Sequence, residues 1–255
     1  MIRNCILVFV VALVLPLVAL NKDMGEITHR KVIVNSDTSY IVANILLFSD
    51  SYIKKLNDNV VYTWYKRNSI KSTKGNYSGE LLDGIFILYD LSGNMKVKGN
   101  YAQGLMDGKW YYWSKKGILL KTVNYKEGLL NGVLVQYNHM GAIVYSIDYK
   151  LGVYNGYYTK YKSGIKISES EFKNGQMRKA KLFRDGLLFK KIFYDKNGQI
   201  RKEKYYENKE ADTNSDESSG TKDGVNKTSE ISSFKKFWNN LFNKDKKNSE
   251  ETQRI

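Results

Sequence analysis

The side chains that could carry out chemistry are few and lie far apart in the sequence. The histidines are His29 and His139, and the single cysteine, Cys5, lies in an apolar stretch near the N-terminus. A metal centre needs a cluster of His, Cys or carboxylate ligands, and a nucleophilic enzyme needs its nucleophile within reach of a base. The sequence offers neither arrangement, so we expect no catalytic residue, no metal and no cofactor.

Asp83 and Asp107 are the best candidates for acid–base chemistry, because each directly precedes a glycine in a similar sequence context. A pair of carboxylates can act as general acid and general base. The next two units of the chain have Asn131 and Asn155 at this place, and a carboxamide cannot replace a carboxylate in proton transfer. Turn formation tolerates both residue types. No Gly-Lys-Ser/Thr opens a helix after the glycines, which excludes a phosphate-binding loop. We expect a protein that is not an enzyme.

The elements that would position these side chains form an internal repeat. An aromatic residue recurs about every 24 residues, a glycine preceded by Asp or Asn follows seven residues later, and another glycine lies nine residues further on. The aromatic positions are Tyr77, Tyr101, Tyr125, Tyr149 and Phe172, the first glycines are Gly84, Gly108, Gly132 and Gly156, and the second are Gly93, Gly117, Gly141 and, one residue early, Gly164. Repeats of this length indicate stacked supersecondary units.

Each unit reads as two strands and two turns. Asp-Gly and Asn-Gly favour type I′ hairpin turns, because both central residues need positive φ. Short β-prone runs separate the glycines: Ile85–Tyr89, Lys109–Trp113, Val133–Tyr137 and Tyr157–Tyr161 after the first, and Met95–Tyr101, Ile118–Tyr125 and Ile143–Tyr149 after the second. We therefore predict a mostly β fold in which residues 60–206 form an elongated, single-layer antiparallel array of β-hairpins with units of about 24 residues.

Both faces of the predicted sheet carry large side chains, because residues alternate between the faces along a strand. Cross-strand packing of aromatic pairs explains these residues, and so does an aromatic surface for a protein partner; the sequence leaves both interpretations open. The candidate partner-binding residues are Trp110, Tyr112, Trp113, Tyr137, Tyr158 and Tyr161.

Two units show the motif most clearly: YAQGLMDGKWYYWSKKG (Tyr101–Gly117) and YKEGLLNGVLVQYNHMG (Tyr125–Gly141). This pattern resembles MORN repeats, in the bacterial variant found in antitoxin-like proteins of toxin–immunity modules. The resemblance covers residues 60–206 and weakens at both ends, where Val60–Ile70 resembles half a unit and residues 172–206 lose the register. It implies a β-hairpin array with a binding role, without naming the partner.

The N-terminus resembles a targeting segment. Cys5–Leu20 has no charged residue and follows Arg3. A membrane-spanning helix needs about 20 apolar residues, so this shorter run favours a signal peptide over residues 1–20, with an uncleaved signal anchor over residues 5–20 as the alternative. We expect a secreted or periplasmic, cell-envelope protein, and for this reason no nucleic-acid partner.

The remaining segments flank the repeat. Residues 21–59 form an N-terminal cap region, in which Ser39–Leu56 fits a helix or two strands. Residues 207–232 are too polar to bury a core, so we predict a disordered linker, followed by an amphipathic helix over residues 233–245 and a disordered tail over residues 246–255. The helix has an apolar stripe that could dock on the sheet, a membrane or a partner's groove: Phe234, Phe237, Trp238, Leu241 and Phe242.

The net charge of +15 concentrates at the end of the repeat, where residues 176–206 hold ten basic and three acidic residues. These cations either protect a sheet edge or form an anionic-surface site of Arg178, Lys179, Lys181, Arg184, Lys190, Lys191, Arg201, Lys202 and Lys204. We therefore predict an exported, non-enzymatic repeat protein that binds a protein partner through its aromatic face or edge, with an antitoxin- or immunity-like role as the specific form. The alternative is a membrane-peripheral scaffold that binds anionic lipid through these cations and the C-terminal helix.

Overall fold

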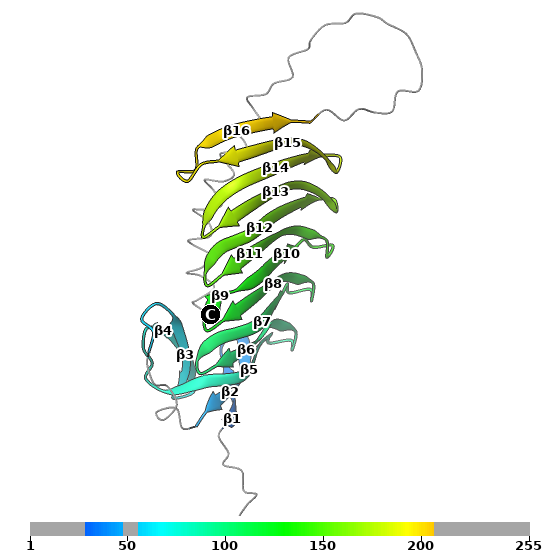
Figure 1. Cartoon of the computed structure of the whole chain (residues 1–255). Coiled ribbons are helices and arrows are strands. Elements are labelled where there is room, and N and C mark those ends of the chain that lie inside the picture. The colour runs from blue at the N-terminus through cyan, green and yellow to red at the C-terminus, as the bar shows by residue number, and fades with distance from the viewer. Residues whose placement is uncertain (1–28, 48–55, 207–255) are drawn as a thin grey trace, which may run out of the picture.

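The chain folds into one open antiparallel β-sheet (Figure 1). The computed structural model describes residues 29–47 and 56–206, and all regular elements in these ranges are strands. They are β1 (His29–Asn35), β2 (Ser39–Leu46), β3 (Val61–Lys66), β4 (Ser69–Lys74), β5 (Glu80–Asp90), β6 (Met95–Ala102), β7 (Leu105–Trp113), β8 (Leu119–Lys126), β9 (Leu129–Leu130), β10 (Gly132–Tyr137), β11 (Ile143–Lys150), β12 (Val153–Lys162), β13 (Ile165–Lys173), β14 (Gln176–Arg184), β15 (Leu187–Tyr194) and β16 (Ile200–Tyr205).

The strands from β5 to β16 follow one another as a meander, each pairing antiparallel with the next, except that the short β9 pairs only with β8. The β1–β2 hairpin extends the sheet beyond β5, so Ser39–Leu46 is a strand and the helical alternative is wrong. The β3–β4 hairpin leaves this path and pairs with the beginning of β5 through Trp64 and Tyr65. The predicted antiparallel single sheet is therefore confirmed, with the N-terminal region contributing two strands to it.

The predicted position of one turn in each unit is wrong. The Asp-Gly and Asn-Gly pairs of the four regular units do not form hairpin turns: Asp83-Gly84 lies inside β5 and Asp107-Gly108 inside β7. Asn174-Gly175 and Asp185-Gly186, beyond the regular register, do form them, with positive φ at both residues. The turn instead uses the glycine three residues after Tyr101, Tyr125, Tyr149 and Phe172, as in Gln103-Gly104, where φ is 50° and 79°. Two consecutive residues with positive φ are the requirement of a type I′ turn, and here a glutamine supplies the first. The second glycine of each unit does close a turn, since Gly93 N–H donates to the Asp90 carbonyl oxygen.

The side chain of the Asp or Asn before the first glycine of each regular unit forms a hydrogen bond to the next unit. Its side-chain oxygen accepts a hydrogen bond from the first turn residue of the next unit, about 20 residues later in the chain. The four bonds are Gln103 N–H to Asp83 at 2.7 Å, Glu127 N–H to Asp107 at 3.5 Å, Leu151 N–H to Asn131 at 3.3 Å and Asn174 N–H to Asn155 at 3.2 Å. The turn glycine also donates to the backbone of the preceding unit, as Gly104 does to Leu82 at 2.6 Å. Each unit therefore holds the turn of the next one.

The first glycine of each of the four regular units lies directly opposite a repeat aromatic. The four cross-strand pairs are Gly84 with Tyr101, Gly108 with Tyr125, Gly132 with Tyr149 and Gly156 with Phe172. These glycines have positive φ, from 68° at Gly108 to 127° at Gly156. Such a backbone bends the strand and disfavours any side chain with a Cβ. A Cβ would also lie close to Asn44 at Gly84, to Asn124 at Gly132 and to Asp148 at Gly156.

The two faces of the sheet differ in burial. On one face, which we call the packed face, Phe86, Trp110 and Tyr158 are each 2% exposed. Trp110 lies edge-on to Tyr101, with ring centroids 5.1 Å apart, and covers Gly99 so closely that no Cβ would fit there. Burial raises the pKa of the Tyr101 hydroxyl to about 12. The other face, which we call the open face, carries Ile87, Tyr111, Val135 and Thr159 in the middle of successive units.

The turn contacts predict how the Asp/Asn position responds to substitution. Asn131→Ala removes the acceptor for Leu151 N–H and should lower the free energy of unfolding by about 1 kcal/mol, the usual net value of such a bond. Asn131→Asp keeps an acceptor oxygen, as the two preceding units do, and should cost much less. Urea unfolding of both variants measures the difference. Equal stability of the alanine and aspartate variants would contradict the role of this side chain as a turn acceptor.

Candidate protein-interaction surface

The open face presents apolar and aromatic side chains in columns that follow the repeat. One column lies directly before the turns and comprises Tyr89, Trp113, Tyr137 and Tyr161, all partly exposed. A second column is more exposed, with Ile85 at 52%, Val133 at 40% and Tyr157 at 49%. These residues come from β5, β7, β10 and β12, whereas the strands between them contribute polar side chains such as Thr122 and Ser146. The open face therefore alternates apolar and polar rows.

Stacking holds the aromatic side chains of this surface in place. The rings of Tyr111 and Trp113 stack with centroids 5.8 Å apart and an interplanar angle of 16°. Tyr40 of β2 stacks on Tyr89 in the same way, at 4.9 Å and 14°. Lys109 Nζ lies 5.6 Å from the centre of the Tyr111 ring. Preordered aromatic rings lose little conformational entropy when a partner covers them, so this arrangement suits a contact surface.

The structure divides the six predicted partner-binding residues between the two faces. Trp113, Tyr137 and Tyr161 lie on the open face and are partly exposed. Trp110 and Tyr158 are core residues of the packed face, so their prediction as contact residues fails because packing already covers their rings. Tyr112 also points to the packed face, where burial raises the pKa of its hydroxyl. The 24-residue spacing does not distinguish them, because Phe86, Trp110 and Tyr158 of the packed face and Trp113, Tyr137 and Tyr161 of the open face both follow it.

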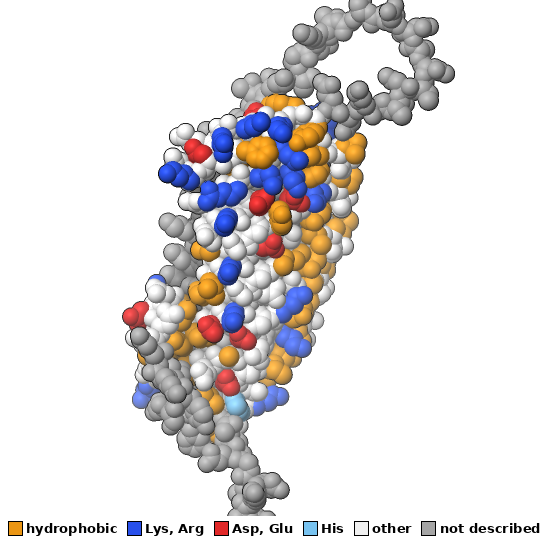
Figure 2. All heavy atoms as spheres, in the orientation of Figure 1, with side chains coloured by type: hydrophobic (Ala, Val, Ile, Leu, Met, Phe, Trp, Pro, Cys, Tyr) orange, Lys and Arg blue, Asp and Glu red, His pale blue; other side chains and the backbone are white. Residues whose placement is uncertain are grey.

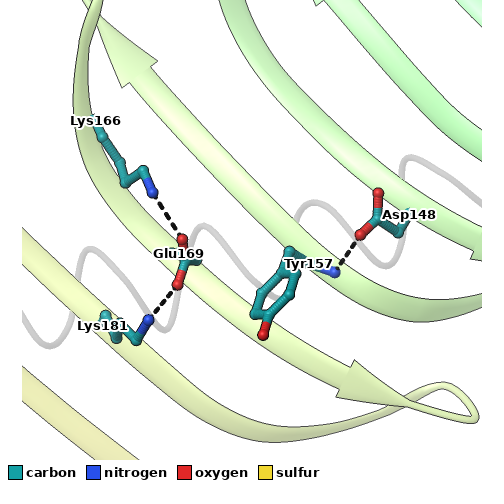
Figure 3. A network of polar contacts seen from close by, with 5 residues as sticks. All are labelled: Asp148, Tyr157, Lys166, Glu169 and Lys181. Atoms are coloured by element: carbon teal, nitrogen blue, oxygen red, sulfur yellow. Dashed lines mark hydrogen bonds and ion pairs between the residues drawn. The ribbon is translucent and has the colours of Figure 1, made fainter.

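Lysine–glutamate ion pairs appear on the open face at β13. Figure 3 shows Glu169 between Lys166 and Lys181, with its carboxylate oxygens 2.7 Å and 2.5 Å from the two ammonium nitrogens. Burial raises the pKa of Glu169, but its hydrogen bonds and its attraction to the two lysines prevail, so the pKa lies below its usual value. Between the two preceding strands, β11 and β12, a carboxylate instead accepts a backbone hydrogen bond: Tyr157 N–H donates to Asp148 at 2.7 Å.

Three of the predicted anionic-surface residues form ion pairs within the sheet. Lys179 pairs with Glu171 at 2.7 Å and Lys181 with Glu169 at 2.5 Å. Lys190 is only 4% exposed and lies on the packed face, 3.0 Å from a carboxylate oxygen of Glu203. Lys190 is therefore a structural residue, and its place in the predicted surface is wrong.

The other predicted cations lie at the surface of the last strands. Figure 2 shows Lys and Arg side chains gathered over β14–β16, with acidic side chains below them. Arg184 and Lys191 lie over the rings of Phe189 and Tyr206, at 4.7 Å and 5.1 Å, and Arg178 donates to Gln176 at 2.8 Å. Arg201, Lys202 and Lys204 are exposed on β16. The positive surface thus contains fewer unpaired cations than the sequence predicts, because Lys179, Lys181 and Lys190 form ion pairs.

Groups with catalytic potential have structural partners in the fold. His29 Nε2 lies 2.5 Å from Asp83 Oδ2, while the other oxygen of Asp83 accepts the turn amide of Gln103. This contact between β1 and β5 could not be predicted from the sequence, because His29 lies outside the repeat that contains Asp83. In residues 29–47 and 56–206, no group of three His, Cys, Asp or Glu side chains is placed to hold a metal ion.

The predicted signal segment and the docking residues Phe234, Phe237, Trp238, Leu241 and Phe242 lie outside the described residues, as do residues 207–232. Within the described ranges, no helix has the length and apolar character needed to cross a membrane. Comparison of the chain with models of known protein families and with the sequences of curated proteins finds no match.

Lys160 gives the packed face a testable pH dependence. Burial lowers its pKa from 10.5 to about 8, and its ammonium lies 6.0 Å from the centre of the Tyr158 ring. Between pH 8 and 10.5 the unfolded chain retains a proton that the folded chain has lost, so stability should rise with pH across this window. Thermal unfolding of the wild type and of Lys160→Met measures this. The variant should be more stable at pH 7 and lack this contribution; a lower melting temperature at pH 7 would contradict the prediction.

Proposed function

We propose that this chain is a non-enzymatic repeat protein that binds a protein partner through its open face. The observation that carries this proposal is the column of partly exposed, 24-residue-spaced aromatics formed by Tyr89, Trp113, Tyr137 and Tyr161. Tyrosine and tryptophan are enriched in the cores of protein–protein interfaces. The stacked pair Tyr111–Trp113 gives this surface a rigid anchor.

The partner that fits this surface is another folded protein with matching apolar rows. Serine and asparagine side chains such as Ser146 and Asn124, which are partly exposed, separate the apolar columns and can form the hydrogen bonds that such interfaces contain. The repeated contacts between units agree with the MORN-like character that the sequence suggests, and an exported protein of this kind fits an antitoxin- or immunity-like role in the cell envelope. In this view the predicted C-terminal helix, residues 233–245, is a second contact element joined by the linker 207–232.

Truncation of the open-face aromatics tests the proposal. Trp113→Ala combined with Tyr137→Ala should lower the affinity for a partner recovered from envelope extract by about tenfold or more, because truncation of an interfacial Trp or Tyr costs about 2 kcal/mol. Affinity is measured with purified components after the partner has been identified. The circular dichroism spectrum and the melting temperature establish that the variant folds.

A matched control uses Leu91→Ala with Met140→Ala. Both side chains are apolar and more exposed, at 66% and 77%, but lie in turns beside the face. This control should bind normally. Undiminished binding by a folded Trp113→Ala/Tyr137→Ala variant would show that the open face is not the site.

A membrane-peripheral role is the second candidate. It is supported by the Lys and Arg side chains over β14–β16 (Figure 2), and the predicted helix 233–245 would add an apolar anchor. Each lysine near an anionic bilayer contributes about 1 kcal/mol, and salt screens this attraction. The ion pairs of Lys179 and Lys181 reduce the charge available for it.

Vesicle sedimentation tests the second candidate. The chain without residues 1–20 should sediment with anionic vesicles, bind neutral vesicles much less, and dissociate as salt rises because the attraction is electrostatic. Charge reversal by Lys191→Glu with Lys202→Glu should reduce binding, whereas Lys115→Glu with Lys116→Glu, in a turn far from β16 along the sheet, should not. Equal binding to both vesicle types would exclude this role.

A further inference from the structure

The strand β16 ends the sheet in the part of the chain that the structure describes, and it offers an open edge. Its neighbour β15 pairs with it on one side only. An edge strand of this kind has backbone N–H and C=O groups that can accept another strand. Five of the six residues of β16 are exposed. Among the described residues, no strand pairs with the outer edge of β16.

A row of lysines crosses the open face toward this edge. Lys181 lies directly opposite Lys191, and Lys191 lies directly opposite Lys204. Like charges directly opposite one another destabilise a sheet. Glu169 compensates Lys181, but among the described residues no salt bridge forms at Lys191, Lys202 or Lys204. The end of the sheet thus has cations that lack the acidic neighbours found one strand earlier.

The sheet already contains a strand whose acidic side chains match a similar pair of lysines. In β13, Glu169 and Glu171 alternate on the open face and lie opposite Lys181 and Lys179 of the antiparallel strand β14. Both pairs form salt bridges, at 2.5 Å and 2.7 Å. Lys179-Ala180-Lys181 in β14 and Lys202-Glu203-Lys204 in β16 have the same spacing of lysines on the same face. An antiparallel strand with carboxylates at alternate positions would therefore place them opposite Lys202 and Lys204, as β13 places its glutamates opposite the lysines of β14.

We propose that the β16 edge binds an extended acidic segment of a partner protein as an added antiparallel strand. The backbone of β16 supplies the hydrogen bonds, and Lys202 and Lys204 select carboxylates two residues apart. A second copy of this chain does not fit through the same strand, because the lysines of both copies would meet. This site is separate from the aromatic columns of the open face, so it stands or fails independently of the function proposed above.

The probe for this site is a fluorescent peptide with the sequence of residues 165–173, IKISESEFK, measured by anisotropy against the full chain. It should bind, and Lys202→Glu with Lys204→Glu should weaken binding by about tenfold, because two attractive cross-strand pairs become repulsive. The same peptide with Glu169→Lys and Glu171→Lys should prefer the charge-reversed protein. Lys115→Glu with Lys116→Glu is the matched control and should leave binding unchanged.

Backbone methylation distinguishes strand addition from simple charge attraction. Two versions of the peptide carry N-methyl groups at alternate residues, one at odd and one at even positions. Only one set of amides faces β16 in an antiparallel pair, so one version should lose binding and the other should retain it. Equal binding by both versions, or no effect of the lysine reversal, would overturn the proposal.

The acidic residues that follow β16 in the sequence are a competing occupant. Glu210 and Asp212 have the same spacing as the two glutamates of β13. Peptide binding that is seen only after Glu210→Gln with Asp212→Asn would show that the chain covers its own edge, which would overturn recognition of a partner. Unchanged binding by this variant supports the proposal.

Discussion

The sheet depends on one repeated constraint, the pairing of a glycine in positive φ with an aromatic ring on the next strand. Gly84 and Tyr101 form the first such pair, and Gly156 and Phe172 the last. The glycine bends its strand, and the preceding Asp or Asn then reaches the turn of the following unit. Loss of the glycine would therefore disturb the bend and the turn hydrogen bond together.

Much of the fold is readable from the sequence, because the residues that repeat are those that the backbone requires. The 24-residue period, the alternation of strands and turns and the antiparallel order all follow from the glycine and tyrosine positions. Which glycine forms the hairpin turn does not follow from these positions. Asp-Gly has a strong intrinsic preference for a hairpin turn, but the side chain of Asp83 finds a donor on the neighbouring unit. A tertiary hydrogen bond thus outweighs the local preference of Asp-Gly for a hairpin turn, which is all that the sequence shows.

The candidate surface was harder to predict, because both faces carry aromatics of the same types. Trp110 and Trp113 are three positions apart and lie on opposite faces. The first packs between Phe86 and Tyr125, whereas the second stacks on Tyr111 at the surface. The cations of the last strands divide similarly. Lys190 is enclosed beside Glu203 and Lys204 is exposed, a distinction that depends on strand register and not on residue type.

The turn contacts also give the sheet a direction. Each acceptor, such as Asp83, precedes its donor by about 20 residues, so it is synthesised before the amide that it binds. A nascent chain can therefore complete every unit on a template that already exists, and can grow from β5 toward β16 without waiting for distant sequence. Such vectorial assembly limits the time during which an unfinished strand edge is exposed to other chains.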